Sequence, residues 1–365
     1  MNRPSNILLN GRQRGRLVVR WLAVVCLSTA LVTPTTWGAD TYALLVGVSG
    51  YPQLPERLRL AGPANDVQLM RASLVTAGLR PANITVLADG VAASRELPTR
   101  AAILSALARL ATVAKRGDWA VIYVSGHGSQ QPQILVNGKA KNGYIEPDGL
   151  DEIFLPLDVG RWDGKLGTVA GAIVDDEFGE AFAKITAKGA HVWAVFDTCH
   201  AGDMAKSLPF GEARPVARHV APTELGVAAS MLRTFGSPQP VAASRKTSTA
   251  QSQGTAPLKL AALGQGQLVS FYASHPDEPA AEERLPDVLT RQHGQKNTRE
   301  LRYFGLFTYV LAQVLNESLT GNGKATPTLA DLSATVAARY KTRPYPRPIF
   351  EGDLTLVPAF FHRAP

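Results

Sequence analysis

A histidine and a cysteine each follow an apolar run, and together they have the chemistry of a general base and its nucleophile. WAVIYVSG leads directly into His127, and VWAVFDT leads into Cys199. An imidazole can take the proton of a thiol, hold a thiolate–imidazolium pair and later protonate a leaving amine. Glycine beside each residue lets a substrate approach the backbone, and the N–H groups of Gly128 and Cys199 are candidate oxyanion donors. These residues predict acyl transfer to a cysteine.

The cysteine count supports this interpretation. The chain has two cysteines, and the other one, Cys26, lies in the N-terminal segment. An exported protein with one remaining thiol forms no internal disulfide, and such a thiol is typically intermolecular or reactive. A lone cysteine is often a small buried apolar residue, and a lone histidine is often structural. Their shared position after two consecutive apolar runs favours the catalytic interpretation.

Apolar runs and amphipathic segments alternate from Thr41 onward. Strands are predicted at 42–48, 84–87, 119–124, 192–196 and 268–272, and helices at 66–76, 100–114, 176–188, 304–317 and 329–341. Continuous apolar runs bounded by Gly, Asp or Ser indicate a parallel sheet covered on both faces. The sequence therefore predicts a doubly wound α/β domain, with His127 and Cys199 at neighbouring carboxyl ends of strands, where such folds place their sites.

The N-terminal segment has the pattern of a secretory signal. Arginines precede an apolar run at 21–32, which small and polar residues follow. We expect residues 1–39 to be a signal peptide and the mature protein, residues 40–365, to be exported to the periplasm or the medium. The apolar run is short for a bilayer span, so no stable membrane association is expected after cleavage. The alternative is an uncleaved anchor that tethers the same domain.

Net charge argues against a nucleic-acid partner. The formal charge is +8, but five arginines precede Asp40, and without them 33 basic residues face 30 acidic ones. A nearly neutral mature chain has no basic footprint for nucleic acid.

Residues 204–265 are rich in Pro, Ala, Ser, Thr and Gly, which predicts a flexible insertion with a helix near 225–232.

The sequence resembles the metacaspases and related caspase-like peptidases, and within them it resembles an exported bacterial member. The resemblance rests first on SGHG at 125–128 and DTCHAG at 197–202, each after an apolar run. It extends over roughly 41–203 and 266–360, through YALLVGVSGY (42–51), GPANDV (62–67), DGLDE (148–152), IVDDE (173–177), ASHPDEPAAE (273–282) and GLFT (305–308). It implies a caspase-like sandwich with a mostly parallel six-stranded sheet flanked by helices, and a catalytic dyad of His127 and Cys199.

The resemblance also implies a specificity pocket lined by Asp66, Ser125 and Asp197. Two carboxylates in one pocket would recruit Arg or Lys through charge-assisted hydrogen bonds. The Gln-Ala pair that precedes the nucleophile in caspases is absent, and Asp197 occupies the first of those positions. The alternatives are a turn-capping role for Asp197 and a helix N-terminal role for Asp66.

A second acidic set is formed by Asp158, Asp175 and Asp176. In metacaspases, acids that match these positions contribute to a calcium site, and hard oxygen ligands suit Ca²⁺. Lys206 stands where the family often has a further acid, with Asp203 nearby. The alternative is that Asp175 and Asp176 complement a helix N-terminus.

We therefore expect a cysteine endopeptidase that acts on peptide or protein substrates after Arg or Lys, through an acyl-thioester intermediate. A non-catalytic caspase-like module that binds a partner through the same crevice is the alternative. The basic residues of the 204–265 segment are candidate self-cleavage sites, namely Lys206, Arg214, Arg218, Arg233, Arg245 and Lys246.

Overall fold

The structure is a computed structural model. It describes residues 39–136, 139–140, 145–146, 148–199, 216–233, 265–275, 278–289, 300–320, 326–341 and 346–361. The chain separates into a unit of residues Met1–Gly38 and a unit of residues Ala39–Pro365. The predicted signal peptide lies outside the described residues, apart from Ala39.

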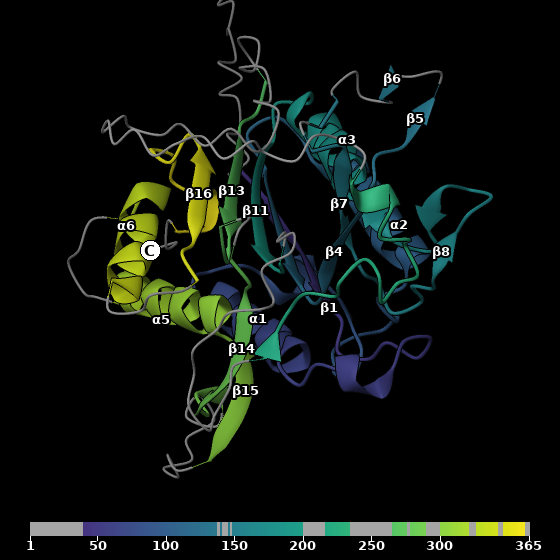
Figure 1. Cartoon of the computed structure of the whole chain (residues 1–365). Coiled ribbons are helices and arrows are strands. Elements are labelled where there is room, and N and C mark those ends of the chain that lie inside the picture. The colour runs from purple at the N-terminus through teal and green to yellow at the C-terminus, as the bar shows by residue number, and fades with distance from the viewer. Residues whose placement is uncertain are drawn as a thin grey trace, which may run out of the picture. The chain divides into compact units, whose positions relative to one another are not determined.

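A six-stranded sheet forms the centre of the second unit (Figure 1). Its strands lie in the order β16-β13-β11-β3-β1-β2. All neighbours pair in parallel except β16, which is antiparallel to β13 at the edge. The bounds are β1 (Thr41–Gly47), β2 (Ile84–Ala88), β3 (Trp119–Ser125), β11 (His191–Asp197), β13 (Leu268–Tyr272) and β16 (Ile349–Gly352). The predicted α/β fold with a mostly parallel six-stranded sheet is confirmed.

Helices cover both faces of this sheet, and successive strand residues point to opposite faces. On one face, Ile122 and Ala194 share a core with residues of α2 (Arg100–Val113) and α3 (Asp175–Thr186). On the other, Val121 and Val195 share a core with residues of α1 (Pro63–Thr76), α5 (Leu306–Thr320) and α6 (Leu329–Tyr340). Each of the five helices predicted outside the 204–265 segment has its counterpart here. None of the helices within the described ranges is long and apolar enough to cross a membrane.

Short strands at the carboxyl end of the sheet were not predicted, because they lack a long apolar run. One three-stranded sheet contains β4 (Gly128–Pro132), β7 (Leu150–Phe154) and β10 (Ile173–Val174). Another contains β12 (Val216–Ala217), β14 (Ala281–Pro286) and β15 (Leu301–Gly305). Two further pairs are β5 (Leu135–Val136) with β6 (Lys139–Ala140), and β8 (Trp162–Asp163) with β9 (Thr168–Val169). Single 3-10 turns span Glu56–Leu58, Pro81–Asn83, Met231–Arg233 and Ala359–Phe361.

The predicted flexible insertion at 204–265 is wrong for residues 216–233. Arg218, Val220 and Leu225 are fully buried, and β12 pairs with β14. The expected helix at 225–232 is replaced by turns and the 3-10 turn Met231–Arg233. Apolar side chains spaced among Pro, Ala and Ser are enough to fold this stretch onto the domain. The rest of the predicted insertion, at 204–215 and 234–264, lies outside the described residues.

Candidate active site

The register of two central strands brings His127 and Cys199 to the same edge of the sheet. Ser125 at the end of β3 pairs with Asp197 at the end of β11, and His127 and Cys199 each follow two residues later. The two backbones approach so closely that a Cβ added at Gly128 would lie 1.8 Å from the carbonyl oxygen of Cys199. Only glycine fits at position 128 beside the cysteine.

His127 is oriented by backbone and aromatic contacts. Its Nε2 lies 2.8 Å from the carbonyl oxygen of Leu58, which can only accept a hydrogen bond, so Nε2 carries the proton. The Tyr51 hydroxyl accepts a hydrogen bond from the His127 N–H at 2.8 Å, and the two rings are 5.0 Å apart. Nδ1 is buried and has no hydrogen-bond partner within the described part of the chain. Nδ1 is therefore the basic nitrogen.

The cysteine and histidine are both uncharged in this arrangement. Burial lowers the pKa of His127 to about 4, although the backbone groups of Leu58 and Arg218 raise it in part. Burial raises the pKa of Cys199 to about 12, and the backbone groups of Ala280 and Arg218 lower it in part. The Cys199 thiol donates to the carbonyl oxygen of Ala280 at 3.3 Å. These shifts favour a thiol and a neutral imidazole, with the Arg218 backbone beside both.

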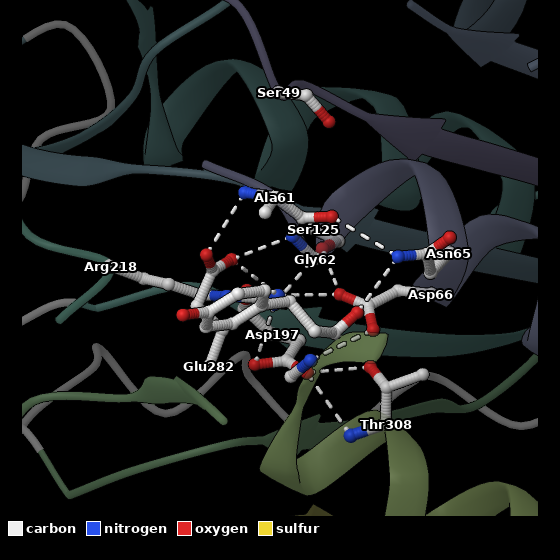
Figure 2. A network of polar contacts seen from close by, with 12 residues as sticks. Ser49, Ala61, Gly62, Asn65, Asp66, Ser125, Asp197, Arg218, Glu282 and Thr308 are labelled. Carbon is white, nitrogen blue, oxygen red and sulfur yellow. Dashed lines mark hydrogen bonds and ion pairs between the residues drawn. The ribbon is translucent and has the colours of Figure 1, made fainter. Parts of the chain in front are cut away.

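Asp66, Ser125 and Asp197 converge on one buried pocket, as Figure 2 shows. Asp66, in the first turn of α1, accepts from the Gly305 N–H at 2.8 Å and from the Ser125 hydroxyl at 2.9 Å. Asp197 accepts from the N–H and hydroxyl of Thr308 at 3.1 and 2.5 Å. Burial raises the pKa of Asp66 to about 7; Arg218 opposes this shift and Asp197 adds to it.

The guanidinium of Arg218 fills this pocket, which the sequence did not single out from the other basic residues of its segment. Nη2 lies 2.5 Å from Oδ2 of Asp66, and Nη1 lies 3.1 Å from Oδ1 of Asp197. Nη1 also donates to the Ser125 hydroxyl at 2.9 Å. Burial disfavours the cation, but the carboxylates of Asp197, Asp66 and Glu282 hold the pKa of Arg218 well above its ordinary value. Arg218 is fully buried and stays charged.

Glu282 supplies a third carboxylate, which sequence reasoning missed as a site residue. Its Oε2 is 3.6 Å from Nη2 of Arg218, and its two oxygens accept from the N–H groups of Ala61 and Gly62, each at 2.9 Å. The only sequence signal was its membership in ASHPDEPAAE. Two glycines leave room for the guanidinium: an added Cβ at Gly62 or at Gly305 would lie 2.6 Å from its nearer nitrogen.

The backbone on both sides of Arg218 is hydrogen-bonded across the site. Val216 and Ala217 pair antiparallel with Glu282 and Ala281. The Arg218 N–H donates to the Ala280 carbonyl at 2.9 Å. The carbonyl oxygen of Arg218 accepts from the Gly128 N–H at 3.0 Å, and the Val220 N–H donates to the Gly128 carbonyl at 3.1 Å. The Gly128 N–H, which is the expected oxyanion donor, is thus hydrogen-bonded to the backbone carbonyl of a basic residue.

The structure does not gather Asp158, Asp175 and Asp176 as the sequence predicted. Oδ1 of Asp158 accepts from the Arg100 N–H at 2.8 Å, at the start of α2. Asp175 lies instead with Glu146 and Glu152, and ligand atoms of these residues lie within 4.8 Å of one another.

The three grouped acids have a donor set that fits Ca²⁺. Burial raises the pKa of Glu152 to about 8 and the pKa values of Glu146 and Asp175 to about 7, with repulsion between neighbouring acids adding to each shift. Asp176 is one of the neighbours that repel Asp175. Close carboxylates that repel one another suit a hard cation that takes oxygen ligands.

Comparison with known proteins finds similarity to the metacaspases over the first part of the domain. Residues 42–208 match the family described as metacaspase, peptidase C14 domain. Metacaspase-1 of Lodderomyces elongisporus is 36% identical over 171 residues, which are 46% of this chain and 34% of that protein. Metacaspase-1 of Schizosaccharomyces pombe is 33% identical over 169 residues, which are 46% of this chain and 35% of that protein. The chain thus spans about a third of the length of these relatives.

One solved structure shares the fold over most of the chain. The crystal structure of protein GSU0716 from Geobacter sulfurreducens superimposes with a TM-score of 0.51 at 19% sequence identity. The superposition covers 89% of this chain and 97% of the other.

Proposed function

We propose that the chain is a cysteine endopeptidase of the metacaspase type that cleaves after arginine or lysine, from the premise that residues 42–208 match the metacaspase, peptidase C14 domain family. The observation that carries the proposal is the position in which Arg218 is bound. The Arg218 side chain is bound by carboxylates. Its backbone carbonyl oxygen accepts a hydrogen bond from the Gly128 N–H, next to Cys199, the single cysteine of the described residues. That is the arrangement that a peptide substrate requires.

The proposed chemistry begins with proton transfer from Cys199 to His127. Leu58 holds the proton on Nε2, so Nδ1 is the atom that accepts the thiol proton. The sulfur then attacks the substrate carbonyl, and the Gly128 N–H stabilises the oxyanion. The imidazolium protonates the leaving amine, and water hydrolyses the thioester with His127 again as the base. The Leu58 carbonyl serves as the orienting group of the imidazole, and the Tyr51 hydroxyl holds the His127 backbone N–H.

The pocket supports a preference for basic residues. Asp66 and Asp197 lie where two nitrogens of a guanidinium are bound, and Glu282 adds a third negative charge at slightly longer distance. A substrate carboxylate would meet like charges in a buried site, which disfavours aspartate. Arginine would bind better than lysine, since its fork reaches two carboxylates at once.

Replacement of the nucleophile or the base tests whether the chain is a peptidase or a binding module. We expect Cys199→Ala to abolish hydrolysis of an arginine-containing peptide and His127→Ala to lower it nearly as much, because the two residues act as a unit. Glu317→Gln is the control, since Glu317 is an exposed carboxylate on α5 paired with Arg339. Hydrolysis by the Cys199→Ala variant at the wild-type rate would exclude this mechanism. No hydrolysis by the wild type under any condition would favour the binding module.

We also propose that Ca²⁺ binds at Glu146, Glu152 and Asp175. The bound ion would neutralise their mutual repulsion and hold β7, which pairs with β4, against the start of α3. We expect Ca²⁺ to raise the Tm of the Cys199→Ala chain, and Asp175→Asn to remove most of that rise. An equal rise in both variants would place the ion elsewhere.

We propose that the protein is exported after removal of the N-terminal segment. The arginines and the short apolar run before Asp40 support this proposal. N-terminal sequencing of protein from the exported fraction should give Ala39 or Asp40 as the first residue. A chain that retains residues 21–32 would instead favour the tethered form.

A further inference from the structure

We infer that Thr308 and Tyr123 are positioning residues for substrate specificity, which together hold the Asp197 carboxylate with one oxygen turned toward the cation of a basic substrate residue. This inference rests on the cleavage after arginine or lysine proposed above. It goes further because it assigns a part of that preference to two uncharged residues, which act through Asp197.

A strand pairing and a helix start bring these three residues together. Ser125 at the end of β3 pairs with Asp197 at the end of β11. Tyr123 lies two residues before Ser125, so its side chain points to the same face of the sheet as those of Ser125 and Asp197. This is the face that α5 covers, and Thr308 is the third residue of α5. The side chains of Tyr123, Asp197 and Thr308 are fully buried.

The chemistry of each group sets the direction of the hydrogen bonds. Thr308 donates its N–H at 3.1 Å and its hydroxyl at 2.5 Å to Oδ2 of Asp197, because a carboxylate only accepts. The hydroxyl proton of Thr308 is thereby used, so the Tyr123 hydroxyl, 2.5 Å from Oγ1 of Thr308, is the donor of the next bond. Burial, to which the Asp66 and Asp197 carboxylates add, holds the pKa of Tyr123 well above its ordinary value. The phenol therefore keeps the proton that it donates.

Two donors on one oxygen fix the rotation of the Asp197 carboxylate. The last side-chain torsion of an aspartate is otherwise broad. With Oδ2 held by Thr308, Oδ1 lies 3.1 Å from Nη1 of the bound guanidinium of Arg218 (Figure 2). The Thr308 hydroxyl could itself rotate, and the bond from Tyr123 restricts it. A chain of hydrogen bonds thus runs from Tyr123 through Thr308 to the oxygen opposite the one that meets the cation.

A purely structural role for Thr308 has different consequences. If its hydroxyl only fastens α5 to β11, its loss would lower stability and affect every substrate equally. A positioning role lowers the use of basic substrates selectively, because only these bring a cation to Oδ1 of Asp197. The N–H groups in the first turn of a helix have no partner within the helix, so the Thr308 N–H can still bind Asp197 when the side chain is changed.

The test uses the purified chain and two peptides that differ only in arginine or alanine before the scissile bond. Thr308→Val keeps the shape and the N–H but removes the hydroxyl. We expect it to lower kcat/KM on the arginine peptide by about tenfold to a hundredfold, mainly through KM, because one bond to a charged group is lost. On the alanine peptide the change should be less than about threefold. Thr308→Ser keeps the hydroxyl and should restore nearly wild-type values on both peptides.

Two further variants test the place of Tyr123 in the chain of hydrogen bonds. Tyr123→Phe should lower kcat/KM on the arginine peptide by about threefold to tenfold, the effect of one uncharged hydrogen bond. In the Thr308→Val background the same substitution should have almost no effect, since Tyr123 acts through the Thr308 hydroxyl. Tyr309→Phe is the matched control, because Tyr309 follows Thr308 in α5 and its hydroxyl donates instead to the Pro286 carbonyl at 3.1 Å. It should behave as the wild type.

Equal losses on both peptides in Thr308→Val would overturn the inference and leave the peptidase standing. Additive effects of the Thr308 and Tyr123 substitutions would overturn it as well, because the two residues would then act separately. If Thr308→Val does not fold, Tyr123→Phe decides, and an unchanged ratio of the two peptides in that variant overturns the inference. A wild type that does not prefer the arginine peptide contradicts the proposed specificity itself.

Discussion

At the scale of single residues, the arrangement concentrates negative charge where a cation is bound. Three carboxylates from α1, β11 and β14 converge on the Arg218 guanidinium. Removing one partner of such a buried pair leaves other charges unpaired and is costly. The pocket carboxylates should therefore affect the binding of basic substrates much more than the cysteine chemistry.

The first prediction concerns Asp197. We expect Asp197→Asn to lower kcat/KM for a peptide with arginine before the scissile bond by about tenfold to a hundredfold, the effect of one charged hydrogen-bond partner. The amide oxygen of asparagine can still accept from Thr308, so the fold should persist. Hydrolysis of a matched neutral peptide should change little. An equal loss on both peptides would show that Asp197 acts on the dyad instead of the pocket.

A second prediction follows from the buried imidazole of His127. Burial lowers its folded-state pKa to about 4 from an ordinary value of 6.5, so its contribution to stability is complete above pH 6.5 and is lost as the pH falls through 4. As the pH falls from 6.5 to 4, the free energy of unfolding of the Cys199→Ala chain should decrease. This decrease should be up to about 3 kcal/mol larger than in the same chain carrying His127→Gln as well. Chemical denaturation at several pH values measures this difference. Parallel pH curves would refute the buried neutral imidazole.

At the scale of elements, the ends of strands and helices decide what can enter the site. Gly305 ends β15 immediately before α5, and Gly62 immediately precedes α1. Both glycines lie against the guanidinium nitrogens. The size of the pocket is therefore set by where these elements meet.

A third prediction tests that close approach. A Cβ at Gly305 would lie 2.1 Å from Oδ2 of Asp197 and 2.6 Å from Nη1 of Arg218. We expect Gly305→Ala to lower kcat/KM on arginine peptides by a hundredfold or more, on the order of 3 kcal/mol of lost binding. Gly179→Ala is the control, because Gly179 lies in α3 with open space around its Cβ position. Unchanged cleavage by a folded Gly305→Ala enzyme would contradict the pocket.

Sequence reasoning predicted the long elements better than the short ones. The five long apolar runs all became strands of the central sheet, since a strand buried on both faces has an unmistakable composition. Strands β4, β12 and β14 are short or polar, and their pairing depends on distant partners. The same reason hid Arg218 and Glu282, because only β12–β14 pairing and burial distinguish them from other charged residues.

At the scale of the whole domain, the central sheet joins segments from both sides of Arg218, one of the candidate self-cleavage sites. β11 precedes Arg218 and β13 follows it, and the two strands pair over five residues. Helices α1 and α5 pack against the same face of the sheet. The apolar core should therefore survive a single break in the connecting chain.

A fourth prediction follows for the cleaved protein. The fragments that end at Arg218 and begin at His219 should elute together on size exclusion at the volume of the intact chain, and should separate only in denaturant. The buried area shared by β11, β13, α1 and α5 provides the physical reason. Separate elution in native buffer would mean that this core does not hold the two parts together.

The central claim is that a buried acidic pocket next to Cys199 selects a basic residue before the scissile bond. The direct measurement is kcat/KM of the purified enzyme on four peptides that differ only in that residue, which is arginine, lysine, alanine or aspartate. We predict arginine above lysine, both far above alanine, and no measurable cleavage after aspartate. Cleavage preferred after aspartate, or equal cleavage of the arginine and alanine peptides, would contradict the account.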